Sequence, residues 1–454
     1  MLTDISACEV SLTQQDSLSA WNNVILGVLS HGQSTGDHLT TLLRLEPNFA
    51  MGHALKGLSC LMLGRRELVA AAQAASNDAE QALTLGGATA RERLWCEALT
   101  DWLAGRPSRS IVRMEAALKL NPADTISMKL SHGIRFMLGD YQGMLRSVER
   151  VISAHGVAHP LYGYALGCHA FALEENGRYA KAESVGLRGL DFAKDDAWGL
   201  HAVAHVYEMT HQTQRGISLI DENHSAWDHC NNFRFHVWWH KALMHLDEGE
   251  IGTVLRLYDT KVRDEKTDDY RDFANASSLL MRLELEGVDV GDRWTELADL
   301  AEKRSDDGCL TFADLHYMLA LVGETRPDAV IRLSAQVAQN ATKADEMAGV
   351  MRTPGVSTAQ GLAAFGEGNF ETAFSYLRTA HSNFQDMGGS HAQRDVFERL
   401  TIEAGLRAGR LAETELLLRG RTAMRAGHED AFAASRMAQI SNLRAMTVPS
   451  TAAN

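Results

Sequence analysis

Proline is scarce in this chain, with 7 among 454 residues, and no stretch alternates valine, isoleucine or threonine with polar residues as β-strands do. Alanine and leucine, which favour helices, are abundant instead. Apolar residues make up 45% of the chain and charged residues 22%, as is usual for a globular protein. The composition therefore predicts an all-α globular protein.

Cysteine pairs and basic runs are also missing. The six cysteines lie far apart without a CxxC pair, which argues against a disulfide framework and against a thiolate zinc site. The net charge is −14, so a nucleic-acid backbone or an anionic membrane surface would repel the protein. We therefore expect no nucleic-acid partner, no membrane partner and a reducing, cytoplasmic location.

Several familiar segments are absent as well. No apolar run approaches the roughly 18 residues of a membrane span. Residues 1–6 show no basic patch followed by an apolar stretch, so we expect no secretory leader. The sequence contains no phosphate-binding loop, nucleophile elbow or dinucleotide fingerprint. Residues 443–454 are expected to form a flexible tail.

What the chain does have is a repeated turn, in which a glycine ends a helical stretch and an aromatic or aliphatic residue follows two positions later. It occurs at Gly139, Gly177, Gly249, Gly368 and Gly409, at intervals of 38, 72 (twice 36) and, for the last pair, 41 residues. Glycine suits a left-handed helix cap, and tetratricopeptide helix–turn–helix units recur about every 34 residues. Since one core rarely grows beyond roughly 250–300 residues, a repeat array explains the length.

Proline marks the other boundary of a repeat, because Pro47, Pro122 and Pro160 each precede or begin a predicted first helix. We predict first helices near residues 48–63, 123–138, 161–176, 196–211, 232–247, 311–322, 356–366 and 390–407. The repeat pattern is weakest over 268–305. The prediction is a single array over residues 1–442, a tetratricopeptide-like α-solenoid of antiparallel helix pairs in a right-handed superhelix.

Histidines are concentrated in one region, with eight of the 19 falling between residues 201 and 245. His201, His205 and Glu208 lie within roughly 60° of one another on a helix. His236 and His240 share a face of the next predicted first helix, with Trp239 beside them. First helices line the concave wall of such arrays, so we predict that both groups face one pocket.

Two uses of this cluster remain open at the level of sequence. Four imidazoles and a carboxylate can bind a divalent metal such as Zn²⁺ or Fe²⁺, with His201, His205, His236 and His240 as ligands. They can also form an acid–base or substrate-anchoring cluster. The spacing differs from the HExxH of zinc proteases, and a lone pair of histidines four residues apart is usually an ordinary polar helix face.

The chain also resembles the tetratricopeptide repeat protein 38 family over nearly its whole length. The matching segments are His201-Ala-Val-Ala-His205-Val-Tyr-Glu208-Met, Trp239-His240-Lys-Ala-Leu, Tyr258-Asp-Thr, Phe49-Ala-Met-Gly-His53-Ala, Ser131-His132, Glu286-Gly-Val-Asp-Val-Gly-Asp-Arg-Trp294, Asp314-Leu-His316 and Gly388-Gly-Ser-His-Ala-Gln393-Arg394-Asp395-Val-Phe397. His391 departs from the family, which has Asn there. The resemblance supports the fold and names no reaction.

This resemblance extends the set of candidate residues, because the family motifs fall on polar positions of the predicted first helices. They map onto His53, His132, His201, His205, Glu208, His236, His240, His316, Arg394 and Asp395. We also expect Arg394 and Asp395 to lie at the histidine pocket, since a long superhelix brings distant repeats together across its groove.

Two functions follow from these residues. The first is a binding module whose polar, His-rich concave wall holds a small polar ligand or peptide, with Arg394 as an anion anchor and Trp239 as an apolar floor. The second is an enzyme, metal-dependent or not, with Glu208 as general base and His240 as its catalytic partner. A plain protein–protein scaffold would lack a deep histidine cluster. The identity of the ligand and the oligomeric state, including a homo-oligomer, are left open.

Overall fold

The computed structural model describes residues 1–447 and shows an all-α chain, as the sequence predicts. Every predicted first helix is present within about two residues of its expected limits. These helices are α3 (Ala50–Met62), α7 (Thr125–Met137), α9 (Tyr162–Glu174), α11 (Ala197–Met209), α13 (Phe233–Asp247), α17 (Thr311–Gly323), α20 (Val356–Gly366) and α22 (His391–Arg407).

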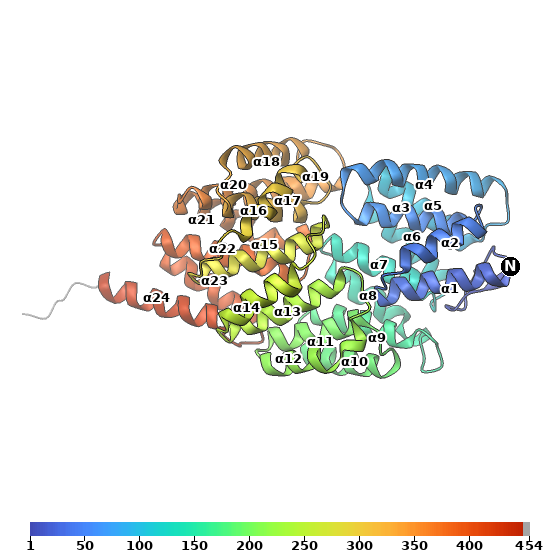
Figure 1. The fold of residues 1–454 in the computed structure, drawn as a ribbon, viewed down its shortest axis with the longest axis horizontal. Coiled ribbons are helices and arrows are strands. Elements are labelled where there is room, and N and C mark those ends of the chain that lie inside the picture. Colours follow the sequence, from blue (N-terminus) through green and yellow to red (C-terminus); the bar gives the residue numbers. More distant parts are fainter. Residues whose placement is uncertain (448–454) are drawn as a thin grey trace, which may run out of the picture.

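Each first helix packs against the helix that follows it. The second helices are α4 (Arg66–Thr84), α8 (Tyr141–Val151), α10 (Tyr179–Phe192), α12 (Thr213–Glu222), α14 (Ile251–Leu257), α18 (Pro327–Asn340), α21 (Phe370–Ala380) and α23 (Leu411–Met424). The pairs stack in sequence order and curl as the expected right-handed superhelix, with blue N-terminal pairs at one end and orange pairs at the other (Figure 1).

The remaining helices were not assigned from the sequence. They are α1 (Gln15–Ser30), α2 (Thr35–Leu45), α5 (Ala90–Leu103), α6 (Pro107–Leu120), α15 (Tyr270–Leu285), α16 (Arg293–Arg304), α19 (Glu346–Val350) and α24 (Ala431–Thr447). The stretch with the weakest repeat pattern thus forms an ordinary pair, α15 and α16. Helix α24 continues into the expected tail as far as Thr447, and residues 448–454 lie outside the described part. One short antiparallel pair, β1 (Leu2–Thr3) with β2 (Glu9–Val10), precedes α1.

The glycine turns behave as the sequence predicts. The five turn glycines have φ between 68° and 74°, the left-handed region that side chains with a Cβ rarely adopt. Gly139 also lies against the distant segment before α22, because a Cβ there would come within 2.1 Å of the Gln385 carbonyl oxygen. This turn therefore needs glycine for its φ and for the close approach of another part of the chain.

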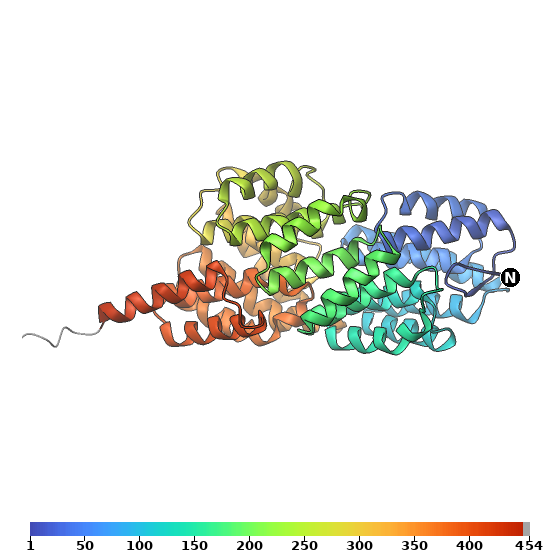
Figure 2. The same cartoon turned by 90° about the horizontal axis from the view of Figure 1, so that it is seen from below.

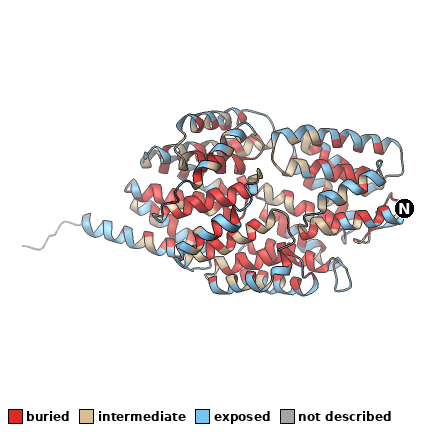
Figure 3. Cartoon of the chain, viewed as in Figure 1, coloured by how far each residue is buried: buried red, intermediate tan, exposed pale blue. Residues whose placement is uncertain are grey.

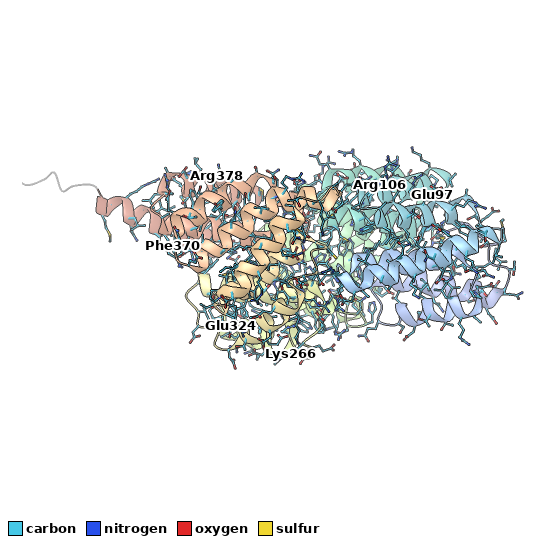
Figure 4. The ribbon with its side chains drawn as sticks, turned by 90° about the horizontal axis from the view of Figure 1, so that it is seen from above. Glu97, Arg106, Lys266, Glu324, Phe370 and Arg378 are labelled. Atoms are coloured by element: carbon cyan, nitrogen blue, oxygen red, sulfur yellow. The ribbon has the colours of Figure 1, made fainter. Side chains whose placement is uncertain are left out.

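The superhelix closes on itself, so its inner wall is largely covered. Gln385 donates a hydrogen bond to the Gly139 carbonyl at 2.8 Å, and the backbone N–H of Glu346 donates to Gly105 at 3.0 Å. Seen from above, the half that carries Phe370 and Arg378 abuts the end of the other half that carries Arg106 (Figure 4). The concave wall, on which the sequence places the candidate pocket, is mostly protein interior.

The middle of the molecule is the most deeply buried region. Helices α9, α11, α15 and α22 carry long runs of buried residues, and the red segments in Figure 3 gather there. Helices α11 and α13 lie between the two ends of the molecule in both views (Figures 1 and 2), whereas α24 projects from one end. Within residues 1–447 the six cysteines are free, and no helix is both long and apolar enough to cross a membrane.

Candidate metal centre

Helices α11 and α13 place four imidazoles around one point. His205 and His201 approach each other with their Nε2 atoms 2.8 Å apart, and His201 and His236 with theirs 3.0 Å apart. The Nε2 atoms of His236 and His240 lie 3.2 Å apart. We call these four residues the histidine tetrad. The two helices bring these histidines together, since one ring nitrogen from each residue lies within 4.8 Å of the other three.

The outward-facing nitrogens of the tetrad mostly meet oxygen atoms. His236 Nδ1 lies 2.8 Å from Asn275 Oδ1, and His240 Nδ1 lies 2.9 Å from Glu208 Oε2. His205 Nδ1 is 3.5 Å from Glu174 Oε2. A ring nitrogen that faces an oxygen acceptor carries the proton, which leaves Nε2 with a lone pair. His236 and His240 are therefore set to present lone pairs to the shared centre, whereas the Nδ1 atom of His205 makes no hydrogen bond.

Burial keeps the four imidazoles neutral. It lowers the pKa of His201, His205 and His240 below the ordinary value, and it lowers the pKa of His236 to about 3. The neighbouring histidines lower the pKa of His201 and His240 further, since positive charges so close together repel. Neutral imidazole is the form that binds metal ions.

Aromatic rings hold the tetrad in place. The fully buried indole of Trp239 stacks on His236, with ring centroids 5.2 Å apart. Phe171 of α9 stacks on His201 at 5.4 Å. The expectation that Trp239 forms an open floor for a ligand is wrong, because its ring is enclosed by protein and supports an imidazole instead.

The tetrad can be compared with a tetrahedral metal site. With bonds of about 2.0–2.1 Å, the ligand nitrogens around zinc lie roughly 3.3 Å apart. Three of the six nitrogen–nitrogen separations in the tetrad are 2.8–3.2 Å, and all four nitrogens lie within 4.8 Å of one another. The partners on the outer nitrogens are of the kind that orients metal-binding histidines in known sites.

Glu208 joins the tetrad to a neighbouring cavity. Its carboxylate contacts His240 and also lines a hollow of about 260 Å³ between α13 and the start of α24. Burial raises the pKa of Glu208, although His205 and Arg425 oppose this shift. Because its carboxylate contacts the Nδ1 atom of His240, Glu208 is placed to orient this member of the tetrad.

Arg394 and Asp395 lie on different faces of α22, because consecutive residues of a helix point about 100° apart. Asp395 lines the cavity next to Glu208, and none of the tetrad histidines lines that cavity. Arg394 does not line it and donates hydrogen bonds to the Tyr141 hydroxyl and the Gly389 carbonyl. We expected both residues at the histidine pocket, but Asp395 lies at the neighbouring cavity and Arg394 links α22 to α8.

Asp395 is part of an ion-pair cluster that we call the arginine–aspartate network. Asp395 accepts from Arg399 and Arg421 at 2.6 Å, and Asp430 accepts from Arg421 at 2.6 Å and from Arg399 at 3.3 Å. Burial alone would raise the pKa of Asp395, but Arg421 and Arg399 hold it well below its ordinary range. The network joins α22, α23 and the start of α24.

The other predicted histidines lie outside the tetrad. His53 of α3 contacts the Pro47 carbonyl at 2.8 Å, and His316 of α17 contacts the Phe312 carbonyl at 2.7 Å. His132 of α7 accepts from the Trp198 indole at 3.1 Å, so it belongs to the aromatic surroundings of His201. The structure therefore does not bring these three residues into the same site, and each keeps one buried ring nitrogen without a hydrogen-bond partner.

Sequence reasoning missed Asn275 and Arg282 of α15 and Glu174 of α9. Asn275 and Arg282 are seven residues apart, so they share a helix face, but the pattern of this stretch was too weak to reveal its first helix. Glu174 is fully buried at the end of α9, and burial together with Glu175 raises its pKa well above the ordinary value. The sequence signal for Glu174 was the acidic pair that it forms with Glu175 at the end of an apolar helix.

No family model matches the chain, so the resemblance to the tetratricopeptide repeat protein 38 family stays a prediction. Among solved structures, human IFIT1 with m7Gppp-AAAA is 13% identical, with 96% of each chain covered and a TM-score of 0.44. Human IFIT1 with PPP-AAAA is 12% identical at the same coverage, with a TM-score of 0.42. Yeast Tom70 is 12% identical, with 96% of this chain and 90% of that chain covered and a TM-score of 0.37. Similarity this low carries no argument about what the present chain binds.

Proposed function

We propose that this chain is a metal-binding repeat protein whose histidine tetrad holds one divalent transition-metal ion. The observation that carries the proposal is the contact between His236 and His240. Both Nδ1 atoms face oxygens, yet the Nε2 atoms lie 3.2 Å apart. Two lone pairs at that distance repel each other unless a cation lies between them, and a metal ion bound by the tetrad supplies that cation.

Zinc suits this site best among the common metals. Four neutral imidazoles in a tetrahedral arrangement match its preference, whereas copper(II) favours tetragonal geometry and non-haem iron usually has a carboxylate ligand. Glu208 would orient His240, Asn275 would orient His236, and Glu174 lies nearest to the outer nitrogen of His205. The metal would join α11 to α13 and so fix two neighbouring repeats at the centre of the molecule.

A closed set of four ligands favours a structural centre over a hydrolytic one. Catalytic zinc sites keep one position for water or substrate, while structural sites are usually filled by four protein ligands. Glu208 already contacts a ligand imidazole, so it is poorly placed as a general base. The sequence also predicts that the chain binds a small polar ligand. We propose the cavity beyond Glu208 as the site for such a ligand.

The direct test is elemental analysis of full-length protein prepared without a metal-affinity tag, then stripped with chelator and dialysed against zinc. We expect one equivalent of zinc in the wild type and none above background in a His236→Ala/His240→Ala double variant. His428→Ala is the matched control, because His428 is exposed and far from the tetrad in sequence. Cobalt-loaded wild type should show the strong visible absorption of a tetrahedral site. Equal zinc content in the wild type and the double variant would refute the proposal.

A further inference from the structure

The cavity beside Glu208 has an opening and two kinds of wall. It measures about 260 Å³ and lies between α13, α14, α22 and the segment that leads into α24. The exposed residues Gly249 and Ala431 lie at its edge. One wall is apolar and is formed by Leu243, Met244 and Phe432. The other wall is charged, and its charges are not evenly compensated.

The acidic groups of the cavity all have close partners. The network satisfies Asp395 and Asp430, and Glu208 contacts His240 at 2.9 Å. Two further carboxylates are also engaged: Glu286 accepts from Arg436 at 2.8 Å, and Asp247 accepts from the Ala431 backbone N–H at 3.0 Å. The cavity therefore presents no free carboxylate to a ligand.

Two buried arginines of the same wall have only long ion pairs and no hydrogen bond to a carboxylate. The Arg282 guanidinium donates to the backbone carbonyls of Ser278 and Ala392, and its nearest carboxylate, Asp395, is 3.9 Å away. Burial lowers the pKa of Arg282 to about 10, although Asp395 opposes this shift.

Arg425 is in a similar position. It donates to the Glu208 backbone carbonyl at 2.8 Å, while its Nε has no hydrogen-bond partner and lies 3.7 Å from Asp430. Buried guanidinium groups normally pair with an anion, because an uncompensated buried charge is unstable. Arg282 and Arg425 are only 1% and 6% exposed, so water compensates them poorly.

We propose that this cavity binds a small organic acid whose carboxylate is held by Arg282 and Arg425 and whose apolar body packs on Leu243, Met244 and Phe432. The planar guanidinium fork matches the two oxygens of a carboxylate. The volume suits a short acid and leaves no room for a folded peptide segment. This ligand would contact the side of Glu208 away from the tetrad, so its binding does not need the metal.

The proposal can be tested by calorimetric titration of the full chain at fixed ionic strength, with hexanoate as the probe. We expect saturable one-site binding of hexanoate, and none of hexylamine, which has the same length and the opposite charge. Inorganic phosphate serves as a second arm, since saturable binding of phosphate without hexanoate would show that the site selects a tetrahedral oxyanion and would overturn the carboxylate proposal.

The variants separate the cavity from the tetrad. Arg425→Gln should weaken hexanoate binding at least tenfold, whereas the exposed Arg419→Gln should leave it unchanged. Arg282→Gln serves as a second variant if Arg425→Gln fails to fold. Chelator-treated wild type should bind hexanoate as tightly as zinc-loaded protein. Binding that disappears with the metal would place the acid on the tetrad and overturn this inference, while leaving the metal proposal intact.

Discussion

The histidine tetrad and the arginine–aspartate network are both buried polar clusters, but only the network is complete in itself. In the network every carboxylate faces two guanidiniums, so charges alternate and the hydrogen bonds are filled. In the tetrad four like groups face one another, with no counter-charge at the centre. The network stabilises the fold through its own ion pairs, whereas the tetrad is the cluster in which we propose a bound cation.

The largest expected effect is the stabilisation of the fold by zinc, which should depend on the tetrad and not on the network. Zinc at about 10,000 times its Kd should add roughly 5 kcal/mol to the free energy of unfolding. Chemical denaturation of zinc-loaded and chelator-treated wild type measures this difference. It should vanish in the His236→Ala/His240→Ala variant and persist in an Asp430→Ala variant. A zinc effect of equal size in the double variant would mean that the metal binds elsewhere.

Removing one member of the network should lower the free energy of unfolding, whether or not metal is bound. Asp430→Ala leaves Arg421 buried with one carboxylate instead of two, and breaking a buried ion pair costs roughly 3–5 kcal/mol. Urea denaturation of the chelator-treated protein gives this value. Glu429→Ala is the control, since that neighbour is exposed. A loss of stability no larger than that of the control would show that the network contributes little.

Acid should weaken the network in a predictable direction. The pKa of Asp430 is held well below its ordinary value because Arg421 and Arg399 outweigh the effect of burial. A carboxyl of this kind stabilises the fold above its unfolded pKa of about 3.9 and loses that contribution as the pH falls toward the folded pKa. Between pH 5 and pH 2.5 we expect the wild type to lose up to about 2 kcal/mol more than Asp430→Asn. Parallel pH profiles would contradict this.

The smallest expected effect concerns the residue that touches both the tetrad and the cavity. Glu208→Gln keeps the size of the side chain but removes its charge, and loss of such a partner usually weakens metal binding by 10–100-fold. Competition with a zinc-binding dye measures the change in Kd. Glu222→Gln on the exposed part of α12 is the control. An unchanged zinc Kd would mean that Glu208 does not support His240.

Local signals made most of the fold predictable. A turn with a glycine at positive φ depends on only a few neighbouring residues. The five turns could therefore be found without knowledge of the packing, and the positions of the first helices followed from them. The spacing of His201 with His205, and of His236 with His240, likewise follows from helix geometry alone. The four histidines that meet in the tetrad were therefore within reach of the sequence.

What could not be predicted depends on how distant repeats meet. Asn275 reaches His236 only because α15 packs against α13, and the sequence gives no sign of that contact. Arg394 and Asp395 are adjacent in the motif, yet the packing of α22 sends them to different neighbours. The closure of the superhelix depends on small rotations accumulated over many pairs, so the sequence does not show how deeply the concave wall is buried.

That closure changes how the array should unfold. In an open solenoid each repeat touches only its neighbours, and the ends can fray while the middle stays folded. Here the turn at Gly139 holds the segment before α22, and Arg436 of the last helix reaches the Leu285 carbonyl. Loss of either end therefore releases contacts in the interior, and the molecule should melt as one cooperative unit. Adding or removing a repeat would pull apart the contacts that close the superhelix. The closure therefore gives this array a fixed number of repeats.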